Sequence, residues 1–207
     1  MNTRERILQI LRSEAASRIR FTFPSALTGH TVTIGPGTFT YVARAIESGR
    51  VHVQVTNHLP AGTGAQYFPT ADLGNTPPVP SANTILTPQV LGRELEGRAI
   101  HECVHAAYDL LRADYITALD DEASAYVVQA LYYRMTGIAQ PRLNTRIRSM
   151  AVNVADLLLK EYARGTHGIP AVPLITWELL RLWVYTSTSP NYAAGPAGTG
   201  GSYTHDG

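Results

Sequence analysis

Two histidines lie four residues apart in the segment AIHECVHAAYDL, residues 99–110, and a glutamate follows the first of them. Imidazoles at this spacing on a helix can direct ring nitrogens at one metal ion from the same face. The histidines are His101 and His105, and Glu102 can reach a water molecule without occupying a coordination position. A carboxylate placed in this way can act as a general base on water whose pKa a metal has lowered toward roughly 7. The segment therefore predicts a zinc site with Glu102 as the base.

A hydrolytic zinc site needs a third protein ligand and an open position. Glu122 follows His105 by seventeen residues, in the helical segment DDEASAYVVQALYY, and the intervening loop is long enough to turn the chain antiparallel. Small residues on both segments would allow the close approach that ligand distances near about 2 Å require: Ala106, Ala107, Ala123, Ala125 and Ala130. We expect His101, His105 and Glu122 to bind one zinc ion per chain. Asp120 or Asp121 is the alternative third ligand.

The remaining pattern indicates the elements that must position this site. Helical spacing predicts helices over residues 3–20, 90–111, 120–135, 143–162 and 174–185, together with a short helix that ends at Gly49. Val51, Val53 and Val55 alternate with polar residues and predict a strand. Residues 59–88 are rich in Gly, Pro, Thr and Asn and contain two extended candidates, AQYFPT and NTILT. We expect an α+β fold with a small, irregular N-terminal β-sheet and a mainly helical C-terminal half.

Length and composition limit the organisation of the chain. With 207 residues and 44% hydrophobic content, we expect a single domain over residues 1–188, followed by a Gly-rich tail over residues 189–207. The net charge of +1 argues against a nucleic-acid partner. The single cysteine, Cys103, excludes an internal disulfide and is expected to be a buried filler. We find no signal-peptide pattern and no membrane span, which favours a cytoplasmic protein or one exported without a cleavable signal peptide.

HECVH followed by a helical E-A-x-A-Y resembles the gluzincin branch of the zincin metallopeptidases. The resemblance covers about residues 82–136. It implies a zincin-like fold, the two histidines and Glu122 as zinc ligands, and Glu102 as the catalytic base. It also implies that a peptide or protein substrate pairs with an upstream edge strand, for which NTILT, residues 83–87, is the candidate.

The sequence departs from the family pattern four residues after the ligand glutamate, where Tyr126 replaces the usual aspartate. We expect Asp109 or Asp121 to orient a histidine instead. A donor to the developing oxyanion is also needed. The candidates are Tyr126, Tyr133, His167 and Tyr185, of which Tyr126 and His167 are assigned as catalytic residues.

Two other interpretations remain open at this stage. The chain could be a non-catalytic helical interaction module with ordinary histidines, or a zinc-binding protein without protease activity. A small peptidase without a leader and with a Gly-rich tail also fits a delivered bacterial toxin or effector. Such a toxin would be restrained in its producer by an inhibitory or immunity partner.

Overall fold

The computed structural model describes residues 2–59, 64–74, 77–139, 146–165 and 168–187. Within these ranges, helices and strands follow in the order α1 (Thr3–Leu11), α2 (Glu14–Arg18), β1 (Phe21–Pro24), β2 (Thr31–Ile34), α3 (Pro36–Glu47), β3 (His52–Val55), β4 (Gln66–Phe68), β5 (Thr84–Thr87), α4 (Arg93–Leu110), α5 (Ala118–Thr136), α6 (Arg146–Ala163) and α7 (Leu174–Ser187). This confirms the expected α+β class, with small sheets and a mainly helical C-terminal half. The Gly-rich tail, residues 189–207, lies outside the described residues.

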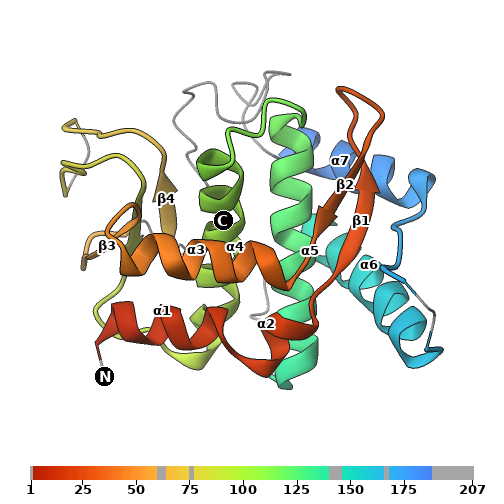
Figure 1. The fold of residues 1–207 in the computed structure, drawn as a ribbon, viewed down its shortest axis with the longest axis horizontal. Helices are drawn as coiled ribbons and strands as arrows, with labels where there is room; N and C mark the ends of the chain where they lie inside the picture. Colours follow the sequence, from red (N-terminus) through yellow and green to blue (C-terminus); the bar gives the residue numbers. More distant parts are fainter. Residues whose placement is uncertain (1, 60–63, 75–76, 140–145, 166–167, 188–207) are drawn as a thin grey trace.

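The two helices that carry the site stand side by side in the middle of the molecule (Figure 1). The strands β3 and β4 lie beyond α4, whereas the β1–β2 hairpin, α6 and α7 lie on the side of α5. Helices α1 and α3 contact α4 and each other across the base of this arrangement. None of the helices within the described ranges is both long enough and apolar enough to cross a membrane.

The helix expected over residues 3–20 forms as two helices. Asn2 and Glu5 make a capping box at the start of α1. Ser13 then accepts a hydrogen bond from the backbone N–H of Ala16 and begins α2. A serine side chain satisfies a helix N-terminus better than it continues a helix interior, so the chain breaks at this position.

The three-stranded sheet has the order β3-β5-β4. Strand β5 pairs in parallel with β3 and antiparallel with β4. The prediction that residues 83–87 form an edge strand is therefore wrong: β5 is central and fully buried, and β4 is an edge of this sheet. Ile85 and Leu86 point to opposite faces of β5 and are both buried, as expected for a strand enclosed within a sheet.

Helices α4 and α5 begin and end where local capping chemistry allows. Thr87 ends β5, and α4 begins after Gly92. The cap of α5 is Thr117: its side chain accepts from the Asp120 N–H, and Asp120 accepts in return from the Thr117 N–H. Gly137 ends α5 with φ 65°, because glycine adopts this left-handed conformation without steric cost.

The contact between α4 and α5 is close, and both helices are buried over most of their length. The small residues expected to line it are all buried: Ala106, Ala107, Ala123, Ala125 and Ala130. Gly97 of α4 lies against the ring of Tyr133 of α5, where an added Cβ would lie 2.4 Å from the ring. The small alanine side chains on both helices thus allow the two backbones to approach closely, so that side chains of α4 and α5 can share one site.

Candidate metal centre

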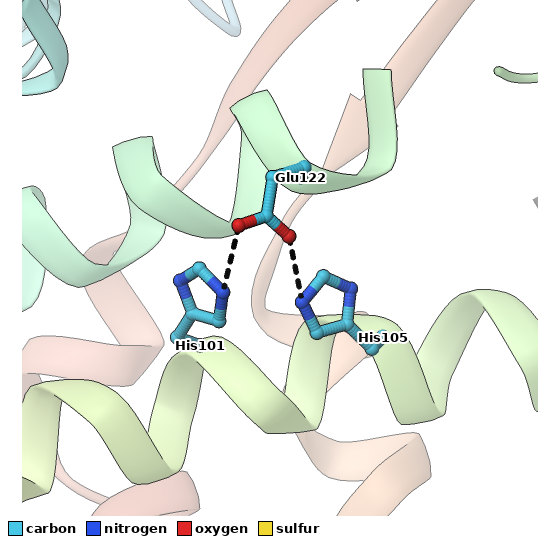
Figure 2. Close-up of side chains that lie close together, drawn as sticks. All are labelled: His101, His105 and Glu122. Carbon is cyan, nitrogen blue, oxygen red and sulfur yellow. Dashed lines mark ion pairs between the residues drawn. The ribbon is translucent and has the colours of Figure 1, made fainter. Parts of the chain in front are cut away.

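His101 and His105 extend from α4 toward Glu122 on the facing turn of α5 (Figure 2). Nε2 of His101 lies 3.8 Å from Oε1 of Glu122, and Nε2 of His105 lies 3.3 Å from Oε2. One ligand atom from each of the three residues lies within 4.8 Å of the others. All three side chains are buried, with exposed fractions of 5%, 2% and 1%. The structure therefore brings together the three residues that the sequence proposed as metal ligands.

These separations suit a small cation. Ligand bonds of about 2.0–2.1 Å at tetrahedral angles place neighbouring donor atoms roughly 3.4 Å apart. The two distances from imidazole nitrogen to carboxylate oxygen, 3.3 Å and 3.8 Å, bracket that value. A carboxylate buried among neutral groups is costly unless a cation neutralises it. The cluster could thus hold a metal ion with little rearrangement.

Asp121 orients the ring of His105 through Nδ1, the nitrogen remote from Glu122. Its Oδ1 lies 2.7 Å from Nδ1 of the ring, and both groups are buried. A proton on Nδ1 donates to this carboxylate and leaves Nε2, the atom that faces Glu122, with its lone pair available for a metal. Of the two aspartates expected to give this support, Asp121 does so. Asp109 instead accepts a hydrogen bond from the hydroxyl of Tyr67 at 2.8 Å.

Neither aspartate proposed as the alternative third ligand lies in the cluster. Asp121 contacts Nδ1 of His105, the ring nitrogen remote from Glu122. Asp120 points the other way: it accepts from the Ala26 N–H at 3.1 Å and lies 3.0 Å from Nε of Arg181. The alternative prediction, in which Asp120 or Asp121 is the third ligand, is therefore wrong for this structure. Asp120 stabilises the N-terminus of α5 instead, where its Oδ2 accepts a hydrogen bond from the backbone N–H of Thr117.

Glu102 is held by the edge strand β4. Its Oε2 accepts a hydrogen bond of 2.8 Å from the backbone N–H of Tyr67, and the side chain is buried. The Tyr67 hydroxyl contacts Asn83 at 2.7 Å as well as Asp109, which fixes the strand against α4. Sequence reasoning missed Tyr67, because a backbone N–H carries no sequence signal and only the pairing of β4 aims it at Glu102.

Tyr126 packs edge-on against His101, with ring centroids 4.8 Å apart. Burial raises the pKa of its phenol, and the nearby carboxylates of Glu122 and Glu102 raise it further. The hydroxyl therefore stays protonated at neutral pH and can donate a hydrogen bond. Among the described residues, Tyr126 is thus the candidate tyrosine that contacts a proposed metal ligand.

The other proposed oxyanion donors are not brought to the site. The Tyr133 hydroxyl donates to the backbone carbonyl of Glu94 at 2.5 Å, a structural role. Tyr185 is exposed on α7. His167, the second residue assigned as catalytic from sequence, lies outside the described residues. Cys103 is buried, and burial raises the pKa of its thiol, which fits the expected packing role.

The two histidines differ in their affinity for protons. Burial lowers the pKa of His101, and the neighbouring carboxylate of Glu122 only partly offsets this. Burial also favours the neutral form of His105, but the charges and hydrogen bonds of Asp121 and Glu122 outweigh it and raise its pKa well above the usual range. In the absence of a cation, a proton on His105 thus balances the buried carboxylates, and a metal has to displace that proton.

Comparison with protein-family models finds no matching family, and comparisons with curated proteins and with solved structures find no significant match. The function has to be inferred from the residues of the site and their geometry.

Proposed function

We propose that this protein is a zinc-dependent metallopeptidase with a zincin-like fold, in which His101, His105 and Glu122 bind one zinc ion and Glu102 is the general base. The observation that carries the proposal is the convergence of these three buried donor atoms within 4.8 Å, with a glutamate next to the first histidine. The resemblance to gluzincins rests on the same residues. The buried cluster argues against a plain helical interaction module, whose histidines would need no shared carboxylate.

The donor set favours zinc. Two imidazoles and one carboxylate are the ligands of many catalytic zinc sites, which keep a fourth position open for water. His105 is already oriented by Asp121, as ligand histidines commonly are. A bound zinc ion supplies Lewis acidity, which lowers the pKa of water and polarises a peptide carbonyl.

Glu102 performs the proton transfers in this proposal. The backbone N–H of Tyr67 holds one carboxylate oxygen, Oε2, and thereby limits the rotation of the side chain. The carboxylate removes a proton from the attacking water and returns it to the nitrogen of the scissile bond, so that the amine leaves as a neutral group. Tyr126, protonated at neutral pH, donates a hydrogen bond to the carbonyl oxygen as negative charge develops on it.

The substrate class follows from the edge of the sheet. Strand β4 pairs with β5 on one side only among the described strands, and its other side faces Glu102 through Tyr67. An extended peptide that runs along β4 would pass next to the base and the ligands. A peptide or protein is therefore the proposed substrate, and β4 takes the role that the sequence interpretation gave to residues 83–87.

The test combines metal content with turnover. We expect one equivalent of zinc in the wild-type protein and in Glu102→Gln, and a greatly reduced content in His105→Ala and Glu122→Ala, measured by elemental analysis of purified, folded samples. A mixture of fluorogenic peptides should be hydrolysed by the wild type only. Folded protein without zinc after supplementation would contradict the metal site. Zinc with hydrolysis that Glu102→Gln retains would contradict the assigned base.

A further inference from the structure

Two arginines near the metal centre have no acidic partner among the described residues. Arg98, in α4, is 9% exposed, and its buried Nε has no hydrogen-bond partner. Arg148, in the first turn of α6, has buried Nε and Nη1 atoms that likewise have none. Several other arginines of the described residues form ion pairs with carboxylates; Arg134, for example, lies 2.9 Å from Asp156. Both guanidinium groups thus have buried nitrogen atoms and no counter-charge within the part of the chain that the structure describes.

Both arginines lie next to the site rather than elsewhere on the surface. Arg98 precedes His101 by three residues, so the two side chains share a face of α4 one turn apart. Arg148 lies on α6, which packs along α5, the helix that carries Tyr126 and Glu122. Both arginines are near enough to Tyr126 to lower its pKa, whereas burial, Glu122 and Glu102 raise it.

The described residues hold Arg98 in place and do not neutralise its charge. A Cβ added to Gly64 would lie 2.4 Å from Cδ of Arg98, so the backbone of the segment before β4 packs directly on the arginine stem. The two arginines also act on each other: burial lowers the pKa of Arg148, and the positive charge of Arg98 adds to this effect. Buried guanidinium nitrogens without a counter-charge, close to a second positive charge, are costly unless an anion neutralises them.

We propose that Arg98 and Arg148 together bind a carboxylate of the substrate beside the metal centre. The planar guanidinium group matches the two oxygens of a carboxylate with paired hydrogen bonds. This inference rests on the proposed peptidase function, since a peptide offers carboxylates at its C-terminus and on Asp and Glu side chains. Arg98 and His101 are three residues apart on α4, which corresponds to about 4.5 Å along the helix axis. One residue of an extended peptide spans about 3.3–3.6 Å, so the bound carboxylate would lie within about one or two residues of the cleaved bond.

The test uses the full chain with zinc and three matched probes, each a dipeptide with an N-terminal mercaptoacetyl group as a metal ligand. The first ends in a free carboxylate, the second in a carboxamide, and the third is a carboxamide with a glutamate side chain. We expect calorimetry to show that a carboxylate improves binding about 10- to 100-fold over the plain carboxamide. Preference for the first probe identifies a C-terminal carboxylate, and preference for the third identifies an acidic side chain.

The variants decide whether the arginines cause this preference. Arg98→Gln and Arg148→Gln should bind the plain carboxamide as the wild type does and lose most of the preference, with zinc content unchanged. Arg134→Gln, which removes a paired surface arginine, should keep the preference in full. Thermal unfolding should show no loss of stability in the two site variants, because each removes an unpaired buried charge. If an arginine had only a structural role, its replacement would lower the unfolding temperature and leave the preference for a carboxylate unchanged.

Failure of this inference is distinguishable from failure of the proposed function. Zinc-dependent binding of the probes without any preference for a carboxylate would overturn the arginine site and leave the metallopeptidase proposal standing. If no probe binds through zinc, the proposed function fails, and acetylated dipeptides without a thiol then test the arginines alone. In that case a shift of the Arg98 and Arg148 Nε–H resonances with the free acid and not with the amide supports the site. Equal spectra with acid and amide overturn it.

Discussion

Nδ1 of His105 and Oδ1 of Asp121 lie 2.7 Å apart in a buried pair that joins α4 to α5. The carboxylate fixes which ring nitrogen carries the proton, and it comes from the residue directly before the candidate ligand Glu122. One turn of α5 thus supplies a candidate metal ligand and the group that orients another candidate ligand. The same contact determines how protons and metal compete for the site.

Replacement of Asp121 by alanine should weaken zinc binding by about 10- to 100-fold, because His105 then loses the group that orients its ring. Competition against a chromophoric chelator measures this change. Asp109→Ala is the matched control, since Asp109 is a carboxylate of the same helix pair but contacts the Tyr67 hydroxyl instead. Equal zinc affinity in Asp121→Ala and the wild type would show that this contact does not support the metal.

Zinc affinity should fall as the pH is lowered. Asp121 and Glu122 raise the pKa of His105, so the proton on its ring competes with the metal below that pKa. The pKa of His101 is lowered, and this ring is neutral already. We expect the apparent affinity to drop about tenfold per pH unit below the pKa of His105, with release of about one proton per zinc. Calorimetry in buffers of different ionisation enthalpy measures both quantities, and a pH-independent affinity would contradict the assignment.

Tyr126→Phe should lower kcat by about 100- to 1000-fold with a small change in KM and no loss of zinc, because a donor to the developing oxyanion is missing. Tyr133→Phe is the control from the same face of α5. Its hydroxyl donates to the Glu94 carbonyl, so its removal should cost about 0.5–1.5 kcal/mol of unfolding free energy and leave kcat unchanged. Similar kinetic effects of both changes would indicate that Tyr126 acts only through packing.

Alanine should have opposite effects at two helical glycines. Gly97→Ala places a methyl group into the ring of Tyr133 and should destabilise the protein by about 1–3 kcal/mol. Gly37→Ala, in α3, meets nothing within 4 Å and should stabilise it by up to about 1 kcal/mol, since alanine favours the helix. Chemical denaturation measures both. A gain in stability at Gly97 would show that α4 and α5 do not pack as closely as described.

Local sequence was enough to predict the helices and the three candidate ligands that the structure brings together. Residues four apart lie on one face of any α-helix, so His101 and His105 could be paired without knowledge of the fold. Glu122 followed from a short connection that turns the next helix back on the first. The left-handed end of α5 at Gly137 was likewise predictable, because only the residue type decides it.

Contacts between distant segments could not be read in this way. Whether residues 83–87 form an edge or a central strand depends on which strands pair with them, and this pairing is non-local. The choice between Asp109 and Asp121 depends on the rotation of α5 about its axis, which packing sets. Arg148 comes from α6, and its approach to Tyr126 has no counterpart in sequence spacing.

The available chemistry is set by the amino-acid sequence: two imidazoles at helical spacing, a carboxylate on the next helix, and Glu102 beside the first histidine. The surroundings of that chemistry depend on how distant segments pack: Asp121 contacts His105, the Tyr67 N–H contacts Glu102, and two arginines without an acidic partner among the described residues lie nearby. The physical reason is the range of the forces involved. Helix geometry relates residues a few positions apart, whereas strand pairing and helix packing relate residues that the sequence separates by tens of positions.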